Sequence, residues 1–381
     1  MINKKINNIY KPTILIVPLD WGLGHATRCV PIIKELLNNN CNVIVGAEAA
    51  TASLLKKEFP ELLIIQLNGY HISYSKKSYF LPFQILIQIP RILIYIYKEH
   101  VWLKKVVKKY SINAIISDNR FGLFHSNIPS VYITHQLLVK TGHSYSEKII
   151  QKINSWFIQK YKYCWVPDFK GSINIAGELS HPISFPKNVQ YIGGLSRFEK
   201  NDNNVIKYEI LVILSGPEPQ RTIFETILLS QLKNTKGPIL FVRGLPKNDF
   251  ITSASFQKNN IHAHLQIVDH LTANDLNNAM LQSKLVISRS GYTTVMDLIK
   301  LQQKAILVPT PGQTEQLYLA DNLYNQQLFY TTPQEDFNLM DAIEKATNFP
   351  YKFPVFNMNE YKIIVSQFVE YLKIEQQKKT T

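Results

Sequence analysis

The chain has 381 residues, enough for two domains, and its 45% hydrophobic and 18% charged residues exclude disordered, collagen-like and coiled-coil proteins. Its 42 Lys and Arg exceed its 28 Asp and Glu by 14, which favours an anionic partner or reflects a genome biased towards lysine. Cys29, Cys41 and Cys164 form no CxxC pair, which excludes a zinc ribbon and a disulfide framework and indicates reduced core thiols in a cytoplasmic protein.

The first third of the chain alternates short apolar runs with helical patterns. The runs predict strands at residues 13–18, 42–46, 62–67, 114–117 and 130–134. The first run passes directly into a Pro-Leu-Asp-Trp-Gly turn and is too short for a signal peptide, so it predicts a buried strand. Because apolar strands that alternate with helices form parallel sheets covered on both faces, we expect a doubly wound α/β unit.

A glycine-containing loop, residues 20–28, joins the first strand to a helix that follows Gly24. Gly22 and Gly24 allow a tight turn and a close approach of the backbone to a ligand. His25 and Arg28 stand three residues apart at the helix start, and a neutral imidazole is a suitable base near pH 7. Together they favour a functional site over the alternative, an ordinary turn between a strand and a helix.

Residues 80–110 combine apolar and basic side chains. Arg91 and five lysines outnumber a single acidic residue, Glu99, and are interleaved with isoleucine and leucine. Two prolines and Arg91 interrupt the apolar run at 80–97, so it is not expected to span a membrane. The segment suits a helix lying on an anionic membrane surface, and a core helix with a solvated basic face is the alternative.

The second half repeats the alternation. Strands are expected at 209–214, 238–243, 267–268, 285–288 and 305–309, and helices at 221–232, 275–283, 293–301 and 315–323. Prolines and glycines concentrate in residues 165–204, which predicts a hinge and linker. We therefore predict an N-terminal domain at 1–190 and a C-terminal domain at 191–355. A last helix, within 356–381, is expected to pack back on the N-terminal domain and to fray after Glu375.

A polar motif follows the strand expected at 285–288 and opens the next helix. Ser290, Gly291 and Thr293 are turn and cap residues, and their hydroxyls and the free N–H groups of a helix start suit a diphosphate. Asp297 lies one turn further along, where a carboxylate can accept hydrogen bonds from both ribose hydroxyls; a solvated helix residue is the alternative.

Three motifs carry a resemblance to a known family: GLGHATR at 22–28, SRSGYTTVMDL at 288–298 and PTPGQTEQ at 309–316. They resemble the GT-B glycosyltransferases of family 28, the group that contains MurG and monogalactosyldiacylglycerol synthase, over residues 12–330. The resemblance implies two Rossmann-like doubly wound domains facing a cleft. In this arrangement the N-terminal domain binds the acceptor and the C-terminal domain binds a UDP-sugar.

The resemblance also implies the site residues. His25 would be catalytic on the acceptor side, in a loop with Gly22, Gly24 and Arg28. The donor would contact Arg197, Ser215, Gly216, His270, Leu271, Ser290, Gly291, Thr293, Asp297, Glu315 and Gln316. Of these, Arg197 would lie near the phosphates and Glu315 and Gln316 would hold sugar hydroxyls. No DxD carboxylate pair follows a strand, so no metal or other cofactor is expected.

The expected activity is metal-independent transfer of N-acetylglucosamine or another hexose from a UDP-sugar to a lipid-linked or cell-envelope acceptor, with inversion. The expected location is the cytoplasm, peripheral at the inner face of an anionic membrane. A UDP-sugar 2-epimerase of the same fold is the alternative, which Asp118, His135 and His181 keep open as further cleft residues. A nucleic-acid-binding protein is a distant alternative, because the basic cluster is interleaved with isoleucine and leucine rather than with stacking aromatics.

Overall fold

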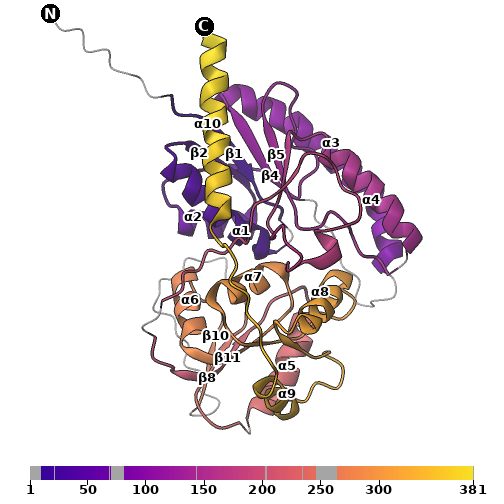
Figure 1. Cartoon of the computed structure of the whole chain (residues 1–381), viewed down its shortest axis with the longest axis vertical. Helices are drawn as coiled ribbons and strands as arrows, with labels where there is room; N and C mark the ends of the chain where they lie inside the picture. The colour runs from indigo at the N-terminus through magenta and orange to yellow at the C-terminus, as the bar shows by residue number, and fades with distance from the viewer. Residues whose placement is uncertain are drawn as a thin grey trace, which may run out of the picture.

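Two parallel β-sheets, each with helices on both faces, form the molecule (Figure 1). The computed structural model describes residues 10–20, 22–67, 69, 81–142, 144–201, 204–233, 235–245 and 264–380. The N-terminal sheet has seven strands in the order β3-β2-β1-β4-β5-β6-β7, and the C-terminal sheet has six in the order β10-β9-β8-β11-β12-β13. The predicted pair of doubly wound α/β units is therefore confirmed.

The N-terminal sheet consists of β1 (Thr13–Val17), β2 (Asn42–Ala47), β3 (Leu63–Gln66), β4 (Ala114–Asp118), β5 (Ser130–Ile133), β6 (Tyr163–Val166) and β7 (Val189–Tyr191). Its helices are α1 (Leu23–Asn38), α2 (Ala49–Glu58), α3 (Leu81–Tyr110) and α4 (Ser144–Ile158), with a short 3₁₀ turn, η2 (Gly177–Leu179). All five strands expected at 13–134 are present, with ends that differ by one residue at most.

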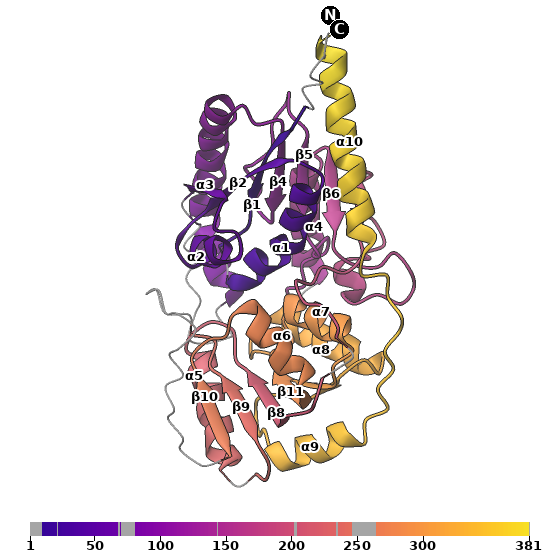
Figure 2. The same cartoon turned by 90° about the vertical axis from the view of Figure 1, so that its left-hand side faces the viewer.

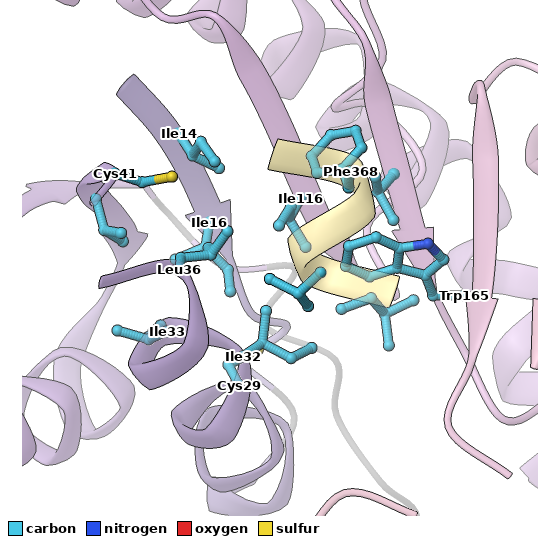
Figure 3. Close-up of a cluster of buried hydrophobic side chains, with 14 of the residues drawn as sticks. Ile14, Ile16, Cys29, Ile32, Ile33, Leu36, Cys41, Ile116, Trp165 and Phe368 are labelled. Carbon is cyan, nitrogen blue, oxygen red and sulfur yellow. The ribbon is translucent and has the colours of Figure 1, made fainter. Parts of the chain in front are cut away.

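The alternation of side chains along β1 explains why this run is apolar throughout. Ile14 and Ile16 face α1, as Figure 3 shows, and belong to the core that also holds Leu36. Leu15 and Val17 point to the other face and pack with side chains of α3. A central parallel strand is buried on both faces, so both sets of positions must be hydrophobic.

The C-terminal sheet consists of β8 (Tyr208–Ile213), β9 (Ile239–Val242), β10 (Leu265–Val268), β11 (Ser283–Ser288), β12 (Ala305–Leu307) and β13 (Tyr330–Thr331). The helices that cover it are α5 (Gln220–Leu232), α6 (Ala273–Leu281), α7 (Tyr292–Leu301), α8 (Thr314–Asn325) and α9 (Leu339–Thr347). Leu211 and Val286 face α7 and α8, whereas Val212 and Ile287 face α5 and α9.

The last helix, α10 (Glu360–Thr380), returns to the N-terminal sheet and runs along it (Figure 2). Its buried residues, among them Val365 and Phe368, join the same core as β1 and α1. Phe368 meets Trp165 edge to face at 5.5 Å between ring centroids. The expectation that the tail frays after Glu375 is wrong: the helix continues to Thr380, and Lys378 Nζ bonds Glu375 Oε1 at 3.0 Å.

The prediction that residues 165–204 form a linker is also wrong for part of that range. It contains the end of β6, the turn η2 and all of β7, which pairs with β6 from Val189 to Tyr191. These strands have only three or four residues, so their apolar pattern is too short to stand out among the surrounding prolines and glycines. Between Tyr191 and Tyr208 the chain crosses from one sheet to the other.

Candidate functional site

The start of α1, just after the loop that follows β1, contacts the start of α7. Gly22 adopts a φ of 80°, a left-handed conformation that suits glycine, and forms the N-cap of α1. The carbonyl oxygen of Gly24 accepts a hydrogen bond of 3.2 Å from Thr293 Oγ1, at the start of α7. A Cβ at Gly24 would lie 3.1 Å from the same hydroxyl. The positive ends of α1 and α7 therefore meet, an arrangement that attracts an anion.

A buried charged network links the first turns of α1 to the end of β4. Asp118, the last residue of β4, accepts hydrogen bonds from Arg28 Nε at 2.8 Å and from Arg28 Nη2. The same carboxylate lies 3.1 Å from Nδ1 of His25. Asp118 is fully buried, so the two basic partners from α1 replace the water that it loses.

The pKa values in this network follow from burial and from these partners. Burial would raise the pKa of Asp118, but Arg28 and then His25 lower it to about 2, so the carboxylate is ionised. Burial and the nearby Arg28 charge lower the pKa of His25 below its ordinary value, against the opposing effect of Asp118. His25 is therefore a neutral imidazole near pH 7, as a general base requires.

His135, just after β5, extends the network to the C-terminal sheet. Its Nδ1 lies 2.9 Å from Arg28 Nη1, and its Nε2 lies 2.8 Å from Oε1 of Glu315, on α8. The imidazole stacks on Tyr292 with 4.0 Å between ring centroids. Gln136 Nε2 donates to the other carboxylate oxygen of Glu315. Residues from two sheets thus form one continuous set of contacts.

The residues expected at the diphosphate lie together at the β11–α7 turn, but their hydroxyls are engaged. Ser290 is buried and donates to the Gln316 carbonyl oxygen at 2.8 Å, while Thr293 donates to Gly24. Gly291 is the N-cap of α7 and, as a glycine, has no side chain with which to cap the helix. The groups available to an anion are therefore the backbone N–H groups of the first turn rather than the two hydroxyls.

Asp297 is buried one turn further along α7. Its Oδ1 accepts a hydrogen bond of 2.6 Å from Ser196, in the crossover between the sheets. Burial raises the pKa of Asp297 to about 6, against the opposing effects of Arg197 and of the Ser196 hydrogen bond. Arg197 Nη1 lies 3.4 Å from Glu58 Oε1 on α2, and within the described residues its buried Nε has no hydrogen-bond partner.

Two further groups expected at the donor follow strands of the C-terminal sheet. Ser215 and Gly216 lie in the exposed β8–α5 turn, where Gly216 has a φ of 103°. His270 and Leu271 follow β10; burial and then the charges of Lys57 and Arg197 lower the pKa of His270. The neighbouring strands β8 and β11 mark the point where the strand order reverses, the usual ligand position in such sheets.

The side-chain amide of Gln316 forms two hydrogen bonds with the loop that precedes α8. Its Oε1 accepts from the Thr310 N–H at 2.9 Å, and its Nε2 donates to Gln313 Oε1 at 2.5 Å. His181 lies apart from the His25 network, against Ser180 Oγ at 2.8 Å and stacked on Tyr191. In the part of the chain that the structure describes, no three His, Cys, Asp or Glu side chains are grouped as ligands for a metal ion.

Sequence reasoning did not place Asp118 and His135 beside His25, and it missed Gln136 and Tyr292. Their positions could have indicated Asp118 and His135, because each stands at the carboxyl end of a strand that neighbours β1 or β4. These ends converge at one edge of a parallel sheet. Tyr292 lay inside a motif already identified, but nothing in the sequence shows that it stacks on an imidazole.

Comparison with known proteins supports this description. Residues 210–365 match the glycosyltransferase family 28 C-terminal domain. No curated protein matches the chain in sequence. Similar solved structures include the glycotransferase of kitacinnamycin, with 11% identity, coverage of 96% of this chain and 95% of that chain, and a TM-score of 0.59. Acinetobacter baumannii MurG has 16% identity, coverage of 97% and 100%, and a TM-score of 0.50.

A third similar structure belongs to a protein described as a UDP-N-acetylglucosamine 2-epimerase from Listeria monocytogenes. It has 12% identity, coverage of 96% of this chain and 97% of that chain, and a TM-score of 0.56. At such identities the likeness concerns the fold, which transferases and an epimerase share.

Proposed function

We propose that this chain, which has the fold of GT-B glycosyltransferases and matches a family 28 C-terminal domain over residues 210–365, transfers a hexose, such as N-acetylglucosamine, from a UDP-sugar to a lipid-linked or cell-envelope acceptor. The observation that carries the proposal is the contact between the starts of α1 and α7, together with the His25–Asp118 pair, whose His25 stands in the first turn of α1. It supports the proposal because His25, the proposed base, is next in the chain to Gly24, which contacts the helix end that suits a diphosphate.

In the proposed reaction the acceptor hydroxyl attacks the anomeric carbon as the bond to the UDP oxygen breaks, which inverts the anomeric centre. His25 Nδ1 lies 3.1 Å from Asp118 Oδ2 and 2.9 Å from Arg28 Nη2, which also donates to Asp118 Oδ1. In the proposed step His25 carries its resting proton on Nδ1, directed at Asp118, and takes the hydroxyl proton on Nε2. Asp118 then stabilises the imidazolium formed. The N–H groups at the start of α7 and the guanidinium of Arg197 stabilise the charge on departing UDP, so no metal is needed.

The proposed donor site uses the C-terminal sheet. Asp297 accepts hydrogen bonds from the ribose hydroxyls, with Ser196 fixing its orientation at 2.6 Å. The backbone at His270 and Leu271 faces the uracil, and the turn at Ser215 and Gly216 closes on the donor. Ser215 and Gly216 follow β8, and His270 and Leu271 follow β10, while Asp297 lies on α7, the helix after β11.

We further propose that α3 and α4 meet an anionic membrane surface. Both contribute to the cluster around Leu19, through Ile96 and Phe157 respectively. The other side of α3 exposes Leu93, Ile94 and Tyr97 among its lysines, and α4 exposes Tyr145, Ile149, Ile153 and Trp156 at intervals of four, four and three residues. Glu99 is buried with its carboxylate 2.7 Å from Arg120, so it does not offset the exposed lysines.

No helix in the described residues, α3 included, is long and apolar enough to cross a membrane. Under this proposal the protein is cytoplasmic and peripheral at the inner face, held by apolar side chains and basic charge together.

Vesicle flotation tests the membrane proposal. The protein is expected to float with phosphatidylglycerol vesicles and not with phosphatidylcholine vesicles, and Trp156→Glu should reduce flotation strongly. Ile374→Glu, which also adds a charge at an exposed apolar position but on α10, is the matched control and should float like the parent. Equal flotation of the Trp156→Glu variant would contradict a role for α4.

A panel of UDP-sugars, incubated with a bacterial lipid extract as acceptor, tests the transfer itself. We expect release of UDP with one donor, unchanged by EDTA because the leaving group is stabilised by N–H groups and Arg197. Asp297→Ala should weaken UDP binding by about 10-fold or more, the range for a hydrogen bond to a charged group. Asp321→Ala, which removes an exposed carboxylate of α8, is the control. Activity lost with EDTA and restored by Mn²⁺ would contradict the metal-independent mechanism.

A UDP-sugar 2-epimerase remains the second candidate, because Asp118 and His135 join His25 in one network of acid–base groups. Incubation of the protein with UDP-N-acetylglucosamine and no acceptor separates the two. A transferase leaves the sugar's configuration at C2 unchanged in the proton NMR spectrum, whereas an epimerase produces the C2 epimer.

A further inference from the structure

Both carboxylate oxygens of Glu315 are held by side chains from the loop after β5. Oε1 lies 2.8 Å from His135 Nε2, and Oε2 accepts a hydrogen bond from Gln136 Nε2. Burial would raise the pKa of Glu315, but His135, His25 and Arg28 together outweigh burial and lower it, so the carboxylate is ionised. The donors that compensate its charge thus come from the N-terminal sheet, although α8 belongs to the C-terminal one.

The position of the proton on His135 follows from its neighbours. Arg28 Nη1, 2.9 Å from Nδ1, can only donate, so Nδ1 must be the acceptor. A neutral His135 therefore carries its proton on Nε2 and donates it to Glu315. The ring is fixed further by stacking on Tyr292 at 4.0 Å, so His135 is held ready to donate before any ligand arrives.

The same loop contacts the first residues of α8 at a second point. The Thr314 hydroxyl donates to the Lys140 carbonyl oxygen at 2.6 Å. Residues 135–140 therefore cover the start of α8, where Glu315 stands in the first turn. Glu315 nevertheless keeps about a third of its side chain exposed, so a ligand can reach the carboxylate that the loop occupies.

Resting on the proposed function, in which Glu315 holds donor-sugar hydroxyls, we propose that His135 and Gln136 form a latch that the donor sugar displaces. Sugar hydroxyls that bind both oxygens in the plane of the carboxylate need the positions that the two side chains occupy. UDP alone does not need them. The latch would then lower the affinity for the UDP-sugar but not for UDP. The contacts of the loop after β5 with Glu315 would therefore differ between the UDP-bound and the UDP-sugar-bound protein.

Calorimetric titrations with UDP and with the transferred UDP-sugar test the latch. Gln136→Met keeps the length of the side chain but removes the donor to Glu315. It should tighten UDP-sugar binding by about tenfold, the order expected for one hydrogen bond to a charged group, and leave UDP binding unchanged. Lys140→Met is the matched control, because Lys140 Nζ bonds Glu178 at 2.6 Å from the same loop without touching Glu315. It should change neither affinity.

Glu315→Gln completes a double-mutant cycle. It should weaken UDP-sugar binding and not UDP binding, and Gln136→Met should gain nothing in its background. If Glu315→Gln weakens UDP-sugar binding but Gln136→Met leaves the UDP-sugar affinity unchanged or lowers it, the latch is overturned while the proposed function stands. The proposed function fails, and the latch with it, on a different result: the parent binds every UDP-sugar of the panel with the same affinity as UDP and releases UDP from none of them.

Discussion

Replacing His25 with alanine is expected to slow sugar transfer by about 10²–10⁴-fold, the usual contribution of a general base. UDP affinity should not change, because the residues proposed to hold UDP lie on the C-terminal sheet, whereas His25 belongs to α1. Turnover at saturating donor and acceptor gives the rate, and calorimetry gives the affinity. His125→Ala is the control, since His125 accepts a hydrogen bond from Asn127 in its own loop. A rate within about threefold of the parent, far below the general-base range, would refute the catalytic role.

The pH profile provides a second readout for His25. Burial and the Arg28 charge lower the pKa of His25, so the neutral base persists below pH 6.5. Activity should therefore be retained near neutral pH and be lost as the pH falls through that lowered value. A merely structural histidine would give no such acid limb. If the acid limb lay above pH 7, His25 would not be the titrating base.

Replacing Arg28 with methionine is expected to lower the free energy of unfolding by about 3–5 kcal/mol, because it leaves the fully buried Asp118 carboxylate without its main partner. Urea denaturation followed by tryptophan fluorescence measures the loss. In the parent, the depressed Asp118 pKa of about 2 contributes stability above the unfolded pKa and loses it as the pH falls through 2. The difference between variant and parent should therefore be largest near neutral pH and shrink below about pH 4.

A second substitution separates an unpaired charge from lost packing. Adding Asp118→Asn to Arg28→Met removes the orphaned charge, so the double variant should be more stable than Arg28→Met alone. A loss below about 1 kcal/mol for Arg28→Met, the range of an exposed ion pair, would contradict the burial of this network.

Much of the fold was predictable because both sheets are parallel. Strands such as β1 and β4 are buried on both faces, so they read as continuous apolar runs with clear ends. The helix α7 was predictable from its turn residues. The strands β6 and β7 were not, because three or four residues bounded by proline resemble a loop in sequence. Their place in the sheet comes from pairing with β5 and with each other, which a local pattern does not record.

The residues of the candidate site could be named from the sequence only in part, and their assembly could not be predicted. His25 and Arg28 stand in one motif, but Asp118 is 90 residues from Arg28 along the chain. Only the strand order, with β1 beside β4, brings them together. Glu99 illustrates the same limit: in sequence it reduces the charge of a basic segment, whereas in the structure it pairs with Arg120 inside the protein. Sequence neighbours do not reveal which face of a helix is buried.

The return of α10 to the N-terminal sheet has a consequence for biosynthesis. The core around β1 and α1 needs Val365 and Phe368, which leave the ribosome after both sheets have been made. The N-terminal sheet is thus the first to be synthesised and the last to be completed. Until then the Trp165 side of that core is exposed, an aggregation hazard for a nascent chain. A stop codon just before Val365 would leave the strands of the C-terminal sheet in place and remove part of the core of the N-terminal sheet.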